Sequence, residues 1–225
     1  MALDILNTIM EVLKQTKENG ELALADSLGK KVLEILDLVQ TDENFIIDRT
    51  QRIALAKLAV EQGASIGEIV ELLTWKDFEG FVASILTANS YQCVESFRRR
   101  GNSLMHGMEI DVIGVKGTTI ITIDAKMWGI RSGKASALKK AAEKQKTRTK
   151  ELSEELDRLA KKMGKLSPKE YQLLPVIVTW LVEEVELHEG VPVVPIFKLN
   201  SFILDFDQYE DLIVCYVGHH HMSSE

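Results

Sequence analysis

The chain has 225 residues, of which 45% are hydrophobic and 27% are charged, an ordinary composition for a folded globular protein. It has no apolar run of the roughly eighteen residues that a membrane-spanning helix needs and no apolar leader, so a cytoplasmic location is expected. Its two cysteines, Cys93 and Cys215, are too few for a zinc knuckle and are expected to be free, buried thiols.

The net charge of −7 is unevenly distributed along the chain. Residues 98–150 carry 13 Lys and Arg against 4 Asp and Glu, a net charge of +9, whereas the segments before and after them carry −8 each. Lysine and arginine neutralise phosphates and release their counterions, so the basic segment favours binding to a polyanion.

The first 73 residues are predicted to form a helical domain. Apolar periodicity and a Ser65–Glu68 capping box predict four helices, at residues 3–16, 21–39, 48–62 and 66–73. The last two helices have the spacing of a helix-turn-helix, but Glu68 and Glu71 are unsuited to a groove lined by phosphates. We therefore predict a domain for dimerisation or partner binding, with DNA reading as the alternative.

Residues 74–225 are predicted to form an α/β (α+β) domain. Thr74 and Asp77 form a capping box that starts a helix to about Ala88, and a strand at 91–97 follows. Glu79 lies on the apolar stripe of this helix, either as a first-turn glutamate favoured by the helix dipole or as a functional carboxylate. The next elements are a hairpin within 107–128, one long helix from about 134 to 163 that Gly164 caps, and a buried strand at 173–182.

The hairpin carries charges that two buried strands should not have. Its predicted turn at Lys116-Gly117 would pair Val115 with Thr118 and place Glu109 opposite Asp124. Alternation would then put Glu109, Asp111, Asp124 and Lys126 on one face. Buried charges need a partner or a metal, so this face indicates a cation site or, alternatively, a structural ion pair with Lys126.

The long helix has a basic first half, and its inward stripe contains the polar residues Gln145 and Thr149. Cations near a helix N-terminus oppose the helix dipole, which favours a functional reason for them. The basic loop before the hairpin is either a solvated turn or a set of phosphate anchors. The candidate anchors are Arg98, Arg99, Arg100, Arg131, Lys134, Lys139, Lys140 and Lys144.

The order helix, three strands, helix, strand, with Glu79, Asp111 and Asp124-Ala125-Lys126 on successive elements, resembles the PD-(D/E)XK nuclease superfamily, in particular its restriction-endonuclease-like and archaeal RecB-like branches. The resemblance implies an αβββαβ core with a central mixed sheet flanked by helices. It also implies that Asp111 and Asp124 bind Mg²⁺ or Mn²⁺ with support from Glu79 and Glu109. Ile110 replaces the proline of the family pattern.

The same resemblance implies that Lys126 orients the attacking water or neutralises the transition state, and that Gln145 is a polar residue of the family's second helix. Carboxylate oxygens select Mg²⁺ or Mn²⁺ over zinc, and no serine or cysteine stands in a nucleophile setting. We therefore expect a Mg²⁺-dependent endonuclease that binds DNA, forms a homodimer and has no membrane contact. The alternatives are a catalytically inactive DNA-binding or scaffold protein of the same fold and a helix-turn-helix regulator.

Overall fold

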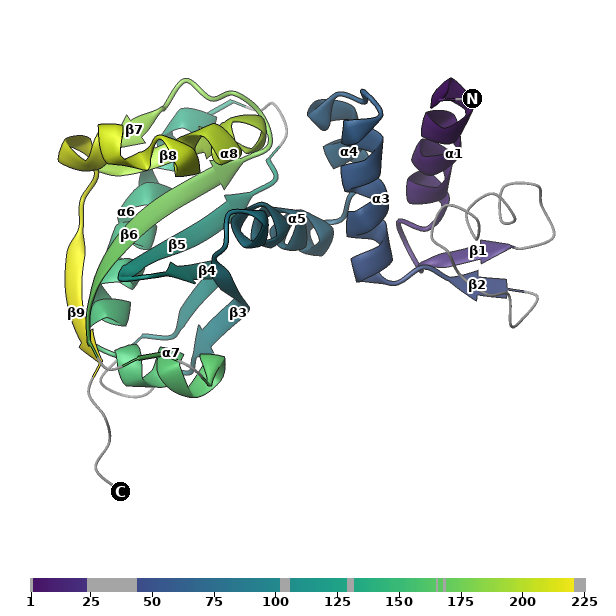
Figure 1. The fold of residues 1–225 in the computed structure, drawn as a ribbon. Helices are drawn as coiled ribbons and strands as arrows, with labels where there is room; N and C mark the ends of the chain where they lie inside the picture. Colours follow the sequence, from purple (N-terminus) through teal and green to yellow (C-terminus); the bar gives the residue numbers. More distant parts are fainter. Residues whose placement is uncertain are drawn as a thin grey trace. The chain divides into compact units, whose positions relative to one another are not determined.

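The fold is seen in a computed structural model that describes residues 2–23, 44–101, 106–128, 132–164, 166–167 and 169–220 (Figure 1). The chain divides into two compact units, residues 1–81 and 82–225. The border falls between Phe81 and Val82, inside helix α5 (Trp75–Ala88), whereas the sequence predicts it at 73/74. Each unit is described by itself.

The N-terminal unit contains short helices and one small two-stranded sheet. Its elements are α1 (Ala2–Gln15), β1 (Glu21–Ala23), β2 (Asn44–Ile46), α3 (Arg49–Glu61), α4 (Ile66–Leu72) and the first half of α5. The predicted capping boxes at Ser65–Glu68 and Thr74–Asp77 are both present and start α4 and α5. The helix predicted over 21–39 is wrong at its start, because Glu21 to Ala23 pair with β2 as an antiparallel strand. Residues 24–39 lie outside the described part.

A buried arginine ties this unit together. Arg52 on α3 is 4% exposed, and its Nε lies 3.0 Å from Oδ2 of Asp77 on α5. Its other nitrogens donate to Leu13 O at 2.9 Å, to the Thr16 hydroxyl and to Leu72 O at 2.9 Å. One guanidinium therefore satisfies acceptors at the C-terminal ends of α1 and α4 and in the first turn of α5.

The C-terminal unit is built on a mixed seven-stranded sheet in the order β3-β4-β5-β6-β8-β7, with β9 beside β6. Its strands are β3 (Gln92–Arg99), β4 (Met108–Lys116), β5 (Thr119–Lys126), β6 (Lys169–Thr179), β7 (Leu187–His188), β8 (Val191–Pro195) and β9 (Tyr216–His220). Strand β6 runs parallel to β5 and β8 and antiparallel to β9, so the predicted central, buried strand is confirmed. The predicted α+β class with a central mixed sheet flanked by helices is confirmed as well.

Helices cover the sheet on both faces. Helix α6 (Lys134–Ser153) runs behind the sheet and α8 (Ile196–Leu204) in front of it, and the 3₁₀ helix η1 (Phe206–Leu212) follows α8 (Figure 1). Leu152 of α6 and Leu156 and Leu159 of α7 (Leu156–Met163) pack with buried side chains of β3 to β6 in one core cluster. This packing explains the inward stripe seen in the sequence.

The single long helix predicted over 134–163 is wrong, because it breaks between Ser153 and Leu156. Gly218 of β9 approaches closely there, and a Cβ at this glycine would lie 2.6 Å from Ser153 O. The close passage of β9 beside the break leaves no room for a side chain at position 218. The predicted cap is confirmed, since Gly164 has φ +70° and donates to Ala160 O.

Candidate functional site

The β4–β5 hairpin turns one residue later than the sequence predicts. Lys116 pairs with Thr119 and Val115 with Ile120, so the two-residue loop is Gly117-Thr118. Gly117 has φ +58°, the sign that the first position of such a loop requires and that glycine adopts without strain. The predicted pairing of Glu109 with Asp124 is therefore wrong; the observed register, continued past its last pair, brings Asp111 beside Asp124.

The single acidic face predicted for the hairpin is interrupted. Ile110 and Ile113 pack in the same core cluster although they are three residues apart, which strict alternation does not allow. On the neighbouring strand β3 the same is true of Val94 and Phe97, and Ser96 between them has φ +50°. A local irregularity of this kind changes which side chains share a face.

Glu109 consequently forms a surface ion pair with its cross-strand neighbour. Nη2 of Arg98 lies 2.7 Å from Oε1 of Glu109, and both side chains are well exposed. The role of Glu109 as a metal ligand and that of Arg98 as a phosphate anchor would both require this pair to open.

Asp111 and Asp124 lie where β4 and β5 separate. The last described pair of the ladder is Val112 with Ile123, and beyond it the Asp111 Oδ2 accepts the backbone N–H of Ala125 at 2.8 Å. A side-chain carboxylate thus takes the donor that a continuing ladder would have used. This contact anchors Asp111 next to the strand that carries Asp124 and Lys126.

Asp124 is 3% exposed and is bound by two cationic side chains. Its Oδ2 lies 2.5 Å from Nζ of Lys126, and its Oδ1 lies 3.0 Å from Nη1 of Arg148 on α6. The three groups together carry one net positive charge. The sequence shows Arg148 only as one of many basic residues of the helix; its position one residue before the inward-facing Thr149 is the signal that could have identified it.

Gln145 is fully buried, as its place on the inward stripe predicts. Its Nε2 donates to the Thr122 hydroxyl at 3.1 Å, and this hydroxyl lies 2.6 Å from that of Thr149. Within the described part of the chain, Oε1 of Gln145 has no hydrogen-bond partner. A buried acceptor without a partner costs stability, so this amide is a place where a water or a substrate group would be favourable.

Glu79 belongs to the N-terminal unit and is 4% exposed. Its Oε2 lies 2.7 Å from Nζ of Lys76, one turn earlier on α5. This pair neutralises the buried carboxylate. The prediction that Glu79 joins the carboxylates of the C-terminal unit stays a prediction.

The predicted phosphate anchors differ in exposure. Arg99 is 5% exposed and pairs with Glu151 and Glu155, at 2.6 Å each, so it has a structural role and is left out of the proposed DNA-contacting set. Lys134 is mostly buried and pairs with Glu183 at 2.5 Å. Arg131 lies outside the described residues. The exposed members of the set are Arg98, which pairs with Glu109, and Arg100, Lys139, Lys140 and Lys144.

The carboxylates of Asp111 and Asp124 are the type of ligand that a hard divalent cation prefers. Mg²⁺ is usually held by one or two carboxylates together with waters and substrate phosphates. Both carboxylates come from adjacent strands at the point where their ladder ends, and two of their partners, Lys126 and Arg148, are flexible cationic side chains that a metal ion could replace.

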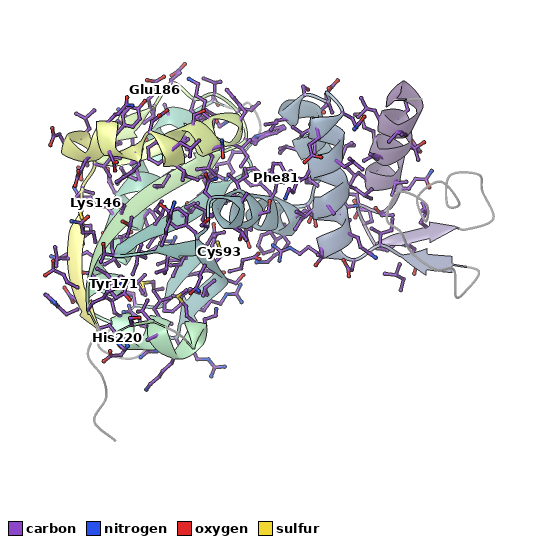
Figure 2. The ribbon with its side chains drawn as sticks, in the orientation of Figure 1. Phe81, Cys93, Lys146, Tyr171, Glu186 and His220 are labelled. Carbon is purple, nitrogen blue, oxygen red and sulfur yellow. The ribbon has the colours of Figure 1, made fainter. Side chains whose placement is uncertain are left out.

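A different group in the described residues brings three ligand atoms together. Atoms of Glu143, His188 and Glu189 lie within 4.8 Å of one another. The cluster is open to solvent, and Lys146 of α6 (labelled in Figure 2) pairs with Glu189 at 3.1 Å. It is distinct from the predicted site, and the sequence analysis did not single it out.

Neither cysteine offers an activated nucleophile. Burial raises the pKa of the Cys93 thiol on β3 (Figure 2), although a hydrogen bond with Thr87 opposes the shift, and burial also raises the pKa of Cys215. Both thiols are free, as predicted, but the predicted burial is wrong for Cys215, which is exposed, and Cys93 is only partly buried. A cavity of about 490 Å³ between β8 and α8 is lined by none of the predicted site residues.

Comparison with known proteins gives matches in sequence and in structure. The chain is 27% identical to an uncharacterized protein of Archaeoglobus fulgidus over 137 residues, which are 61% of this chain and 95% of that protein. The chain also aligns with the crystal structure of protein VC1899 from Vibrio cholerae, with a TM-score of 0.39 and 13% identity. That match covers 94% of this chain and 53% of VC1899, so the chain spans about half of that protein. No family model matches the chain.

Proposed function

We propose that the chain is a Mg²⁺- or Mn²⁺-dependent endonuclease of the PD-(D/E)XK type that hydrolyses phosphodiester bonds in DNA. The observation that carries the proposal is the convergence of Asp111, Asp124 and Lys126 where β4 and β5 separate. Two carboxylates and an ammonium where two strands separate are the groups that metal-assisted phosphodiester hydrolysis uses.

Each residue of the proposed site has a separate role in binding or in hydrolysis. Asp111 and Asp124 would hold the metal ion, which when bound supplies charge to the phosphoryl oxygen and lowers the pKa of a water. Lys126 places an ammonium beside the reacting phosphate, where negative charge develops. The exposed lysines of α6 hold the DNA backbone, since Lys139, Lys140 and Lys144 present positive charge to solvent along one helix. Gln145 keeps a buried amide oxygen for a water or substrate group.

The N-terminal unit is proposed to mediate dimerisation or partner binding in the cytoplasm. Glu68 and Glu71 on α4 are both exposed, which supports the earlier inference against DNA reading by this helix. In the described part of the chain, no helix has both the length and the apolar character to cross a membrane.

Cleavage of plasmid and single-stranded DNA tests the proposal. Wild-type protein should cleave with Mg²⁺ or Mn²⁺ and not with EDTA, and Asp124→Ala and Lys126→Ala should abolish cleavage. Asp211→Ala and Lys116→Ala, which remove exposed charges of the same kinds, are the controls. Cleavage that survives both site substitutions, or that is indifferent to EDTA, would contradict the proposal.

A second candidate is a DNA-binding scaffold without catalysis. It is favoured by one observation, the occupation of both oxygens of Asp124 by cationic side chains, as in a purely structural ion pair. DNA binding that weakens with salt, without cleavage under any metal condition, would select this candidate.

A further inference from the structure

Arg148 occupies the position of a counter-ion at the proposed metal ligand. Its Nη1 lies 3.0 Å from Oδ1 of Asp124, and its side chain is 17% exposed. Asp124 itself lies in the interior, so the guanidinium reaches it from the border of the inward-facing side of α6. The guanidinium thus places its positive charge beside the carboxylate oxygen that a bound metal ion would contact.

The two cations at Asp124 are held differently. Lys126 is two residues from Asp124 on the same strand, and its Nζ also lies 5.6 Å from the ring centroid of Trp128. The contact described for Arg148 is the one with Asp124. A divalent cation at Asp124 would repel both groups at short range, and Arg148, on a long flexible side chain, loses the fewest contacts on leaving.

We propose that Arg148 is an exchangeable counter-ion, an inference that rests on the proposed nuclease function. Arg148 neutralises Asp124 in the metal-free protein and turns to a DNA phosphate when Asp124 holds a divalent cation. Guanidinium groups suit this exchange because they bind carboxylates and phosphates with the same fork of donors. Metal binding and DNA binding then favour the same arrangement, so each increases the affinity for the other.

The test measures metal and DNA affinity in the full chain. Mn²⁺ is titrated calorimetrically into wild type, Arg148→Met, Asp124→Asn and the matched control Lys150→Met, which removes an exposed charge from the same helix. All four proteins, the wild-type background included, carry His188→Ala, so that the Glu143, His188 and Glu189 cluster contributes equally little to each. A DNA duplex is then titrated with and without Ca²⁺.

Arg148→Met should bind Mn²⁺ roughly tenfold more tightly than wild type, because one charged competitor is gone. Lys150→Met should stay within about twofold, and Asp124→Asn should lose the site. Ca²⁺ should increase the DNA affinity of wild type by several-fold and that of Arg148→Met hardly at all. If Arg148→Met does not fold, Arg148→Gln gives the same comparison with a neutral donor.

The two proposals fail in distinguishable ways. Mn²⁺ binding that needs Asp124 but is equal or weaker in Arg148→Met would overturn the exchange and leave the metal site in place. Wild type without any Asp124-dependent Mn²⁺ binding would overturn both. A Ca²⁺ effect on DNA affinity that is unchanged in Arg148→Met would also overturn the exchange.

Discussion

Two buried aspartates, one in each unit, are paired with arginine in different ways. Asp77 and its partner Arg52 have side chains that are 4% and 5% exposed, and Arg52 also donates to backbone oxygens of Leu13 and Leu72. The side chain of Asp124 is 4% exposed, whereas the side chains of Arg148 and Lys126, which bind it, are 17% and 21% exposed. The Arg52–Asp77 ion pair is enclosed and is tied by further hydrogen bonds to two backbone segments. The ion pairs of Asp124 lie where strands β4 and β5 separate.

The difference separates a structural ion pair from one that can change partners. Removing Arg52 would leave the buried Asp77 carboxylate without its counter-ion and would take a donor from the backbone oxygens of Leu13 and Leu72, which is a large penalty. Moving Arg148 breaks one contact, and its guanidinium can reach solvent. A buried charge by itself therefore does not identify a functional site. A cation that is held by several fixed acceptors, as Arg52 is, has a structural role, whereas a cation with one contact, as Arg148 is, can change partners.

The largest effect is expected from removing the enclosed arginine. Arg52→Met should lower the free energy of unfolding of the N-terminal unit by about 3–5 kcal/mol, because Asp77 stays buried and unpaired. Arg148→Met should cost only about 1 kcal/mol. Urea denaturation followed by circular dichroism measures both, with the exposed Lys57→Met as the control. Equal losses in the two arginine variants would remove the distinction.

Arg99 tests the same distinction within the C-terminal unit. Arg99→Met should lower the free energy of unfolding by about 2–4 kcal/mol, since Glu151 and Glu155 lose their buried partner. The DNA affinity of the folded protein should not change. A variant that keeps its stability and loses DNA affinity would restore Arg99 to the DNA-contacting set.

Lys140 should behave in the opposite way. This lysine is exposed on α6, so Lys140→Met should leave the free energy of unfolding within about 0.5 kcal/mol of wild type. The slope of log K against log salt for DNA binding should fall by about 1, the contribution of one phosphate contact. Anisotropy titrations over a salt series provide the measurement, and an unchanged slope would place the DNA elsewhere.

The thiols should show the smallest effects. Only the thiolate reacts with iodoacetamide, and the raised pKa of Cys93 and Cys215 reduces the thiolate fraction at a given pH. Alkylation of the folded protein should therefore be slow at neutral pH and accelerate only at a higher pH than in urea. Cys93→Ser should leave DNA cleavage unchanged. Fast alkylation at neutral pH would revive a cysteine mechanism.

The sequence predicts those features that depend on neighbours along the chain. The capping boxes at Ser65 and Thr74 and the cap at Gly164 are local signals, and all three are present. The α+β class follows from the alternation of helical and strand periods over many residues. These caps form where the sequence predicts them because each satisfies backbone donors or acceptors that lie within a few residues.

Features that depend on distant partners could not be predicted. The break between α6 and α7 accompanies the approach of Gly218, and the interior place of Arg99 depends on glutamates more than fifty residues away. Arg148 likewise reaches Asp124 across 24 residues. The predicted hairpin register is wrong by one residue at the turn. The predicted loop Lys116-Gly117 and the observed loop Gly117-Thr118 both contain the glycine that a two-residue turn favours, so the sequence does not distinguish them.

Parallel measurement of Asp124→Asn and Asp77→Asn tests the central claim most directly. We predict that the free energy of unfolding of Asp124→Asn lies within about 1 kcal/mol of wild type, whereas its Mg²⁺-dependent DNA cleavage falls by roughly a thousandfold or more. Asp77→Asn should instead lose about 3–5 kcal/mol of unfolding free energy. An Asp124→Asn protein that cleaves DNA like wild type, or that is destabilised as much as Asp77→Asn, would contradict the assignment of Asp124 to a metal site.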